Sequence, residues 1–368
     1  MPDYVTILDT TLRDGEEAPG FGLTTPQKVE MAQQLALLGV DAIEAGFPAV
    51  SAENFEAVQR IAREVRGPVI TGLARAVAAD IDQCWEAVKD AERPRIHTFL
   101  PPADMHADGL KREQAKARAA AMVAHARHYT PDVEFSPMDA TRSDWSYVAE
   151  VFESVIDVGA TTVNIPDTLG FAQPDELALM VTYLREHVSN INRATISVHC
   201  HNDLGVAVAN SLAAIGAGAR QVECCINGIG ERAGNAALEE LVMALTVRRD
   251  HHHVEHGIQL EQLVPTSSLL QQLTGVLVQP NKAVVGVNAF GNEVGTGIPQ
   301  DVLKGALRAR LEQLGLLLTQ DELNHAFTGF KRLSENKSEL TDADLVQIAN
   351  NGRRAADGVF DAIGHVYR

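Results

Sequence analysis

The chain has 368 residues, of which 45% are hydrophobic and 22% are charged, as in an ordinary soluble globular protein. Its formal net charge of −18 at pH 7 argues against sequence-independent binding to nucleic acid or to an anionic membrane surface. No apolar run reaches the roughly 20 residues that span a bilayer, and no secretory signal is visible. The four cysteines show no zinc spacing, so we expect reduced thiols and a cytoplasmic protein.

Short β-type runs alternate with helical patterns up to residue 249. Strands are expected to begin near residues 5, 41, 69, 95, 133, 161, 195 and 221. Helical stretches lie between them, among them 27–38, 53–65, 112–128, 144–158 and 174–187. Eight β-then-α units of about 30 residues each predict an α/β fold of the (β/α)8 TIM-barrel type. A doubly wound open sheet is the alternative, but it usually has fewer units, and no Gly-rich phosphate turn follows the first strand.

The alternation stops at about residue 250, so we expect a barrel domain over 1–250 and a smaller, mainly helical domain over 251–368. Amphipathic patterns predict helices over 302–314 and 319–333. A further short helix is expected to begin after the capping sequence at Thr341.

Polar residues gather where the predicted barrel strands end. Because the chemistry of a TIM barrel takes place at the carboxyl ends of its strands, these residues are candidates for a catalytic centre. In chain order they are Arg13, Asp14, Glu44, His97, Glu134, Ser136, Asn164, Asp167, Thr168, His199 and His201.

The pair His199 and His201 carries the clearest chemical signal. Two residues apart at a strand end, both imidazoles point to the same face. Together with Asp14 they can hold a divalent cation and leave coordination positions open. Asp9, earlier on the first strand, is expected either to orient a ligand or to be the buried partner of Arg13.

A Gly-rich segment follows the eighth predicted strand, with the sequence GIGERAGN over 228–235. It could be a simple turn. Its charged and amide side chains among glycines favour a close approach of the backbone to a ligand.

Three segments of the chain resemble the DRE-TIM metallolyases: DTTLRDGE at 9–16, HCHNDLG at 199–205 and NGIGERAGN at 227–235. Further matches lie at 95–99 (RIHTF), 133–137 (VEFSP) and 164–168 (NIPDT). Within that superfamily the chain is most similar to the 2-isopropylmalate synthase family, from about residue 5 to residue 249 and more weakly beyond.

The resemblance implies an acyltransferase that condenses acetyl-CoA with a 2-oxo acid in a metal-dependent Claisen-type reaction. The implied ligands of the divalent cation are Asp14, His199, His201 and Asn235, and the metal could be Mg, Mn or Zn. The resemblance also implies a homodimer, with the helical domain as lid and dimerisation subdomain.

The resemblance assigns further roles by position. Arg13 is expected to stabilise charge on the keto oxygen, and Thr168 to bind the substrate carboxylate. Glu231 is the candidate for the base that removes a proton from the methyl group of acetyl-CoA. The lyase branch carries a cysteine in this loop, where the present chain has Glu231 and Arg232.

The expected substrate pocket favours 2-oxoisovalerate, which would give 2-isopropylmalate for leucine biosynthesis. Its expected lining residues are Leu73, His97, Glu134, Ser136 and Asn164. The alternatives are a homocitrate or citramalate synthase that uses 2-oxoglutarate or pyruvate.

The chain departs from the family pattern at several positions. Glu17 replaces a glutamine, Met138 stands where an acidic residue is common, and Pro299 replaces the histidine of the lid motif. The tyrosine that follows in the lid and a full leucine-binding regulatory domain are not found in the sequence. A third hypothesis is therefore a homologue that binds metal and 2-oxo acid but has lost turnover.

Overall fold

The computed structural model describes residues 3–290, 299–334 and 340–356. The chain divides into two compact units. The first comprises Met1–Ile258 and Leu273–Val276, and the second comprises Gln259–Gln272 and Leu277–Arg368.

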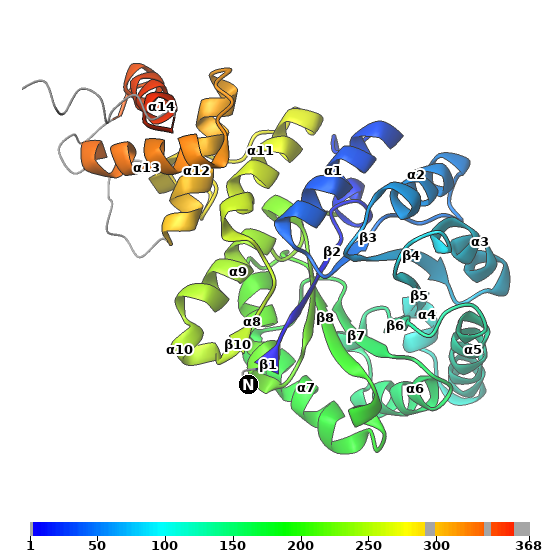
Figure 1. Ribbon diagram of the computed structural model, residues 1–368. Helices are drawn as coiled ribbons and strands as arrows, with labels where there is room; N and C mark the ends of the chain where they lie inside the picture. Colours follow the sequence, from blue (N-terminus) through cyan, green and yellow to red (C-terminus); the bar gives the residue numbers. More distant parts are fainter. Residues whose placement is uncertain (1–2, 291–298, 335–339, 357–368) are drawn as a thin grey trace, which may run out of the picture. The chain divides into compact units, whose positions relative to one another are not determined.

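The first unit is a closed barrel of eight parallel strands in sequential order (Figure 1). Its strands are β2 (Thr6–Asp9), β3 (Ala42–Glu44), β4 (Val69–Arg75), β5 (Pro94–Leu100), β6 (Val133–Pro137), β7 (Thr162–Asp167), β8 (Thr195–Cys200) and β9 (Gln221–Cys224). The predicted TIM barrel is confirmed, and each predicted strand start lies within one residue of the observed one.

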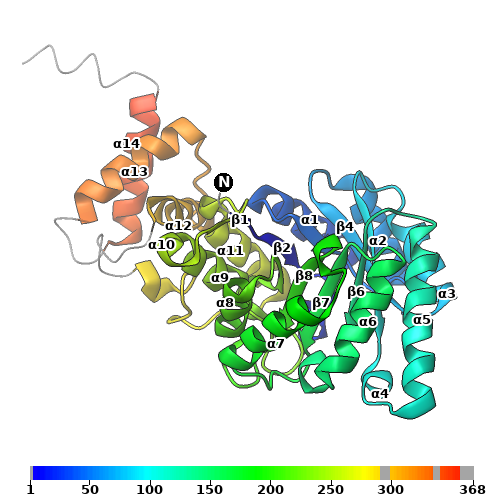
Figure 2. The same ribbon diagram turned by 90° about the horizontal axis from the view of Figure 1, so that it is seen from below.

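Helices surround the strands on the outside of the barrel, as two perpendicular views show (Figures 1 and 2). The long ones are α1 (Thr25–Leu38), α2 (Ala52–Glu64), α3 (Ala78–Val88), α5 (Gly109–Arg127), α6 (Trp145–Asp157), α7 (Pro174–His187), α8 (Ala207–Ala217) and α9 (Leu238–Val247). Short helices α4 (Pro102–Met105) and α10 (Arg249–His252) follow β5 and α9.

Local sequence signals set the helix ends. The side chain of Ser51 accepts a hydrogen bond from the backbone N–H of Asn54 and so caps α2. Thr24 and Gln27 form a capping box at the start of α1. Gly39 ends α1 in the left-handed conformation, with a φ of 85°, which glycine adopts at little cost.

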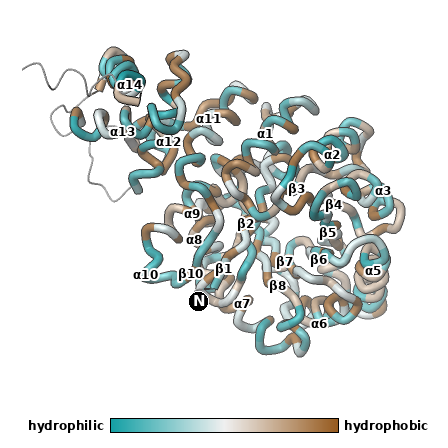
Figure 3. Tube along the Cα trace, in the orientation of Figure 1, coloured by the Kyte–Doolittle hydropathy of each residue, from teal (hydrophilic) through white to brown (hydrophobic). Residues whose placement is uncertain are grey.

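Aliphatic side chains build the barrel core, and the tube alternates between hydrophobic and hydrophilic segments along the outer helices (Figure 3). The interior of the barrel also holds a buried polar network. Arg95 donates to Glu134 at 3.0 Å and to Gln221 at 2.9 Å, and Gln221 donates to the other Glu134 oxygen at 2.6 Å. These hydrogen bonds join β5, β6 and β9 across the barrel, and they compensate the burial of the two charges.

A second, two-stranded sheet was not predicted from the sequence. Strand β1 (Asp3–Tyr4) pairs in parallel with β10 (Val254–Glu255). Nearby, the Tyr4 hydroxyl donates to Asp41 at 2.6 Å. This sheet ties the start of the chain to the segment that follows the barrel.

The second unit contains helices α12 (Gln300–Gln313), α13 (Gln320–Ser334) and α14 (Asp342–Ala356), and α11 (Leu263–Thr274) begins in it. The predicted helices over 302–314 and 319–333 are confirmed. Helices α12, α13 and α14 bury a common apolar cluster that comprises Leu307, Leu311, Leu323, Ala326, Phe327, Leu345, Ile348 and Ala349. Among the described residues, no helix is long and apolar enough to cross a membrane.

Candidate active site

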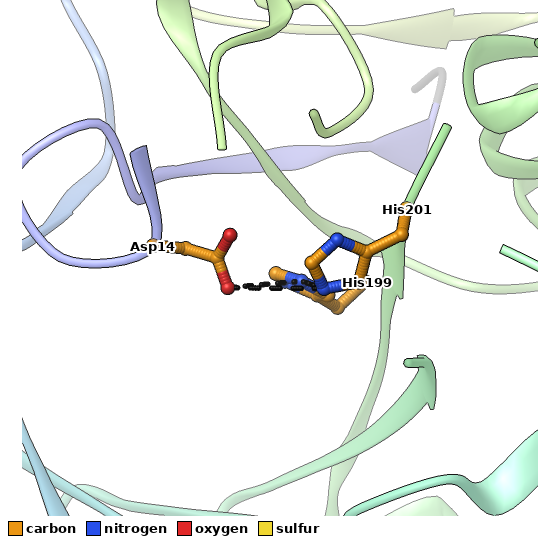
Figure 4. A group of neighbouring side chains, drawn as sticks. All are labelled: Asp14, His199 and His201. Atoms are coloured by element: carbon orange, nitrogen blue, oxygen red, sulfur yellow. Dashed lines mark hydrogen bonds and ion pairs between the residues drawn. The ribbon is translucent and has the colours of Figure 1, made fainter. Parts of the chain in front are cut away.

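Asp14, His199 and His201 come together at the carboxyl ends of β2 and β8 (Figure 4). The Nε2 atoms of the two histidines lie 3.2 Å apart, and Asp14 Oδ2 lies 3.6 Å from His199 Nε2 and 3.8 Å from His201 Nε2. All three side chains are buried. The structure therefore places these three residues, singled out from the sequence, within reach of one ion.

Neighbouring side chains orient this group. Glu223 on β9 accepts a hydrogen bond from Nδ1 of His199 at 2.7 Å, which leaves Nε2 to face the other two residues. Asn235 donates to Asp14 Oδ1 at 2.6 Å. The guanidinium of Arg13 donates to Asp14 Oδ2 at 2.7 Å.

These residues fit a single divalent ion. A triangle with the observed edges matches ligand distances of about 2.0–2.2 Å to a central ion. The Oδ1 atom of Asn235 is buried and has no hydrogen-bond partner among the described residues, as expected of an oxygen that can join the ligand set. Two imidazoles, a carboxylate and an amide oxygen suit Mg, Mn or Zn.

Electrostatics favour an ionised Asp14 and a neutral His201. Burial would lower the pKa of His199, but the neighbouring Glu223 and Asp14 outweigh burial and raise it. Burial alone would raise the pKa of Asp14, but the neighbouring Arg13 and His199 and the hydrogen bond from Asn235 outweigh it and hold that pKa well below its usual range. Burial and the neighbouring His199 lower the pKa of His201 to about 3. A carboxylate and a neutral imidazole are the protonation states that metal binding requires.

A chain of buried hydrogen bonds leads from Arg13 into the predicted substrate pocket. Arg13 Nε donates to Glu44 at 2.5 Å, and the other Glu44 oxygen lies 2.7 Å from His97 Nδ1. His97 Nε2 lies 2.7 Å from the Ser136 hydroxyl, which also accepts from Asn164 at 2.9 Å. These contacts join residues of β3, β5, β6 and β7.

The other predicted site residues lie on the same barrel. Leu73 is buried on β4, in register with His97, which is in register with Glu134 on β6. Thr168 is half-buried directly after β7. Glu231 lies on an exposed loop after β9, and Arg232 donates to its carboxylate at 2.8 Å.

One predicted pairing is wrong. Asp9 does not pair with Arg13: it accepts hydrogen bonds from the backbone N–H and the hydroxyl of Thr11, each at 2.9 Å. The buried carboxylate that partners Arg13 is Glu44 on the neighbouring strand. Asp9 instead stabilises the start of the loop that carries Arg13 and Asp14.

Sequence reasoning missed Glu223, Arg95 and Gln221. Glu223 is in register with His199 on the adjacent strand. A charged residue within an otherwise apolar strand needs a partner, because burying an unpaired charge is costly. That rule, applied to the run Gln221–Cys224, could have found Glu223.

The model of the HMGL-like family matches residues 4–270. The 2-isopropylmalate synthase of Pyrococcus furiosus is 51% identical over 95% of this chain and 76% of its own length. That of Syntrophus aciditrophicus is 51% identical over 94% of this chain and 72% of its own length.

Solved structures support the same fold. The hydroxymethylglutaryl-CoA lyase of Pseudomonas aeruginosa matches with a TM-score of 0.61 at 19% identity, and covers 75% of this chain and 95% of the lyase. The lyase of Brucella melitensis matches with the same TM-score at 18% identity, over 74% of this chain and all of the lyase. At these identities the likeness concerns the barrel fold alone. The sequence matches go further, and the chain belongs to the HMGL-like family and, within it, to the family of the 2-isopropylmalate synthases.

Proposed function

We propose that this protein catalyses the metal-dependent condensation of acetyl-CoA with 2-oxoisovalerate, in the leucine branch of amino-acid biosynthesis. Water completes the reaction, and the products are 2-isopropylmalate and free CoA. The observation that carries the proposal is the buried group of Asp14, His199 and His201 beside Arg13, in a chain about half identical to 2-isopropylmalate synthases over most of its length.

Asp14, His199, His201 and Asn235 would hold the divalent ion. When bound, the ion supplies Lewis-acid polarisation of the keto group of the 2-oxo acid. Among the described residues, Arg13 donates two of its five side-chain N–H groups, to Asp14 and Glu44, and the others would serve an oxygen on which negative charge develops.

The chain's own residues would bind and orient the 2-oxo acid. Thr168 would donate a hydrogen bond from its hydroxyl to the substrate carboxylate. Leu73 offers an apolar surface to the branched side chain, while His97, Ser136 and Asn164 are locked in position by their mutual hydrogen bonds. Glu134 would support this pocket indirectly, because its carboxylate accepts hydrogen bonds from Arg95 and Gln221 in the interior of the barrel.

Glu231 is the proposed base for the methyl group of acetyl-CoA. It takes one methyl proton, and the resulting carbanion attacks the keto carbon while the C=O π pair moves to the keto oxygen. That oxygen takes up a proton to become the hydroxyl of the product, and water then cleaves the thioester to a carboxylate and free CoA. Because Arg232 pairs with Glu231 in the structure, this step requires that the carboxylate turn from Arg232 toward the substrate.

Free-thiol release from acetyl-CoA tests the proposal. We would supply 2-oxoisovalerate, pyruvate and 2-oxoglutarate in parallel, with Mg, Mn or Zn, and use Asp14→Ala as the control. Release with 2-oxoisovalerate that is lost in the variant supports the proposal, and release with another acid identifies a homocitrate- or citramalate-type synthase.

Thiol release with none of the three acids would favour the homologue without turnover. The observation behind that alternative is Pro299, which stands at the N-terminal cap of α12 in place of the lid histidine. Residues 296–298 of the same motif lie outside the described part of the chain.

The remaining partners follow from the same proposal. The protein would act on acetyl-CoA and a 2-oxo acid in the cytoplasm, without nucleic acid or membrane, as a homodimer whose helical domain (251–368) serves as lid and dimerisation subdomain. Light scattering that gives the mass of a monomer would remove the dimer from the proposal.

A further inference from the structure

A continuous set of hydrogen bonds runs through the loops that follow five consecutive strands, β5 to β9. Its members are His106, Asp139, Thr168, Asp203 and Arg232, one from each loop, and together they are called the Thr168 belt here. All five residues lie in the barrel unit. Thr168 is at the centre of the belt, between Asp139 on one side and Arg232 on the other.

The side chain of Asp139 is held in place by hydrogen bonds to two other residues, Arg142 and His106. Its carboxylate is buried, accepts two hydrogen bonds from Arg142 (3.0 and 2.6 Å) and lies 2.7 Å from Nε2 of His106. Its backbone has a φ of 62°, in the left-handed region that few non-glycine residues adopt. Such a conformation persists where the surroundings hold it, and it is often associated with function.

The anchored backbone of Asp139 determines how the Thr168 hydroxyl can act. The N–H of Asp139 donates to Thr168 Oγ1 at 2.8 Å. A hydroxyl has one proton and two lone pairs, so this bond occupies a lone pair and leaves the proton to be donated elsewhere. Within the part of the chain that the structure describes, that proton has no acceptor.

Arg232 holds the main chain of the same residue. Its Nη2 donates to the carbonyl oxygen of Thr168 at 2.7 Å. Two further bonds of 2.8 Å to the carboxylate of Asp203 keep the guanidinium in place. Thr168 is therefore held at both its side chain and its backbone by residues from different loops.

We propose that Asp139 is a positioning residue, which turns the proton of the Thr168 hydroxyl toward the carboxylate of the 2-oxo acid, and that Arg232 supports it from the opposite side. The inference rests on the proposed function, in which Thr168 binds that carboxylate. Asp139 itself touches no substrate, and its effect is confined to the 2-oxo acid and does not extend to acetyl-CoA.

The test compares Michaelis constants for the two substrates. Asp139→Gly keeps the left-handed backbone accessible but removes the carboxylate that anchors it. We expect the KM for 2-oxoisovalerate to rise at least about tenfold, with the KM for acetyl-CoA changed less than about twofold. Equal rises in both constants would overturn the proposal, because a general loosening of the barrel would act on both.

A double-mutant cycle provides the second readout. Thr168→Val removes the hydroxyl at nearly constant volume, so Asp139→Gly should add little in that background. Effects of the two substitutions that multiply would show that Asp139 acts by another route and would overturn the proposal. The matched control is Asp90→Gly, which removes an exposed aspartate paired with Arg63 before β5 and should leave both constants unchanged.

Two measures keep the result interpretable. If Asp139→Gly does not fold, Asp139→Asn replaces it, since it keeps the shape of the side chain while weakening the bonds to Arg142 and His106. If the wild-type protein releases no thiol from acetyl-CoA, the same cycle is measured as the dissociation constant of 2-oxoisovalerate by calorimetry on the Mn-loaded protein. Binding that weakens by the same pattern supports the positioning role even when the proposed reaction fails, and binding indifferent to Asp139 overturns it.

Discussion

His97 and Glu44 form a buried ion pair inside the barrel, with His97 Nδ1 only 2.7 Å from Glu44 Oε1. Burial opposes a charged imidazole, but the nearby Glu44 and Glu134 carboxylates outweigh burial and raise the pKa of His97 from 6.5 to about 9. Burial would raise the pKa of Glu44, but the contacts of Glu44 with Arg13 and His97 outweigh burial and lower that pKa. The pair links Arg13 to the predicted substrate pocket, so its charge state bears on both stability and binding.

The first prediction concerns how His97→Gln changes stability with pH. Because the pKa of His97 is higher in the folded state, its protonation stabilises the fold fully below about pH 6.5, and the contribution is lost as the pH rises through about 9. The loss of unfolding free energy in the variant should be larger at pH 6 than at pH 10, by about 3 kcal/mol at most. Urea unfolding of both proteins across this range measures it, and a difference independent of pH would contradict it.

The second prediction concerns Glu223, which orients His199. Glu223→Gln replaces the charged acceptor of the His199 Nδ1–H bond with a neutral amide. Loss of such a partner typically weakens metal binding by about 10–100-fold. Titration with Mn or Zn against a competing chelator measures the affinity, and Glu186→Gln on the exposed face of α7 is the control. Unchanged affinity in Glu223→Gln would show that the carboxylate does not support the site.

The third prediction concerns the Gly-rich loop after β9. A Cβ atom at Gly230 would lie 2.1 Å from Asn235 Nδ2 and 3.0 Å from Asp14 Oδ1, and its φ is 153°. Gly230→Ala must therefore displace Asn235 and disturb Asp14, and we expect metal affinity and thiol release to fall at least about tenfold.

Gly216→Ala is the matched control for that substitution. Gly216 lies in α8, and a Cβ there would meet nothing within 4 Å. The change should leave metal affinity unaltered and stabilise the fold by about 0.5–1 kcal/mol. Equal metal affinity in the two alanine variants would contradict the role given to the loop.

The fourth prediction concerns the helical unit. A Cβ at Gly352 in α14 would lie 2.5 Å from the backbone oxygen of Glu322 and 3.0 Å from Ala326, which are both in α13. A Cβ at Gly329 in α13 would make only an ordinary contact of 3.8 Å with Ile348. Gly352→Ala should therefore force α13 and α14 apart and cost about 1–3 kcal/mol, while Gly329→Ala should stabilise the helix. Calorimetry of the full chain measures the stability of both variants. A Gly352→Ala variant as stable as Gly329→Ala would contradict the prediction.

The barrel was predictable because short β-type runs and helical patterns alternate eight times at a spacing of about 30 residues. The run Val133–Pro137, for example, is buried along its whole length, as expected of a parallel strand covered on both faces. The pairing of β1 with β10 was not predictable. Each strand has two residues, too few for a pattern, and about 250 residues separate them.

The candidate site was predictable to the extent that it follows strand ends. His199, His201 and Asp14 could be placed together because the barrel rule brings strand ends to one rim. The sequence marks Glu223 as a buried charge that needs a partner, but it does not show that the partner is His199, because that pairing depends on the register between β8 and β9. Asp9 illustrates the limit: proximity in sequence favours it as the partner of Arg13, but the partner in the structure is Glu44 on the neighbouring strand.

The Thr168 belt joins one residue from each of five successive loops. A change in the sequence of one of these loops therefore removes hydrogen bonds that a neighbouring loop also needs. An engineer who wishes to change the acid that this barrel accepts should exchange the loops after β5 to β9 as a single block from one relative. Libraries that vary one of these loops alone should consist largely of variants in which one member of the belt has lost a hydrogen-bond partner.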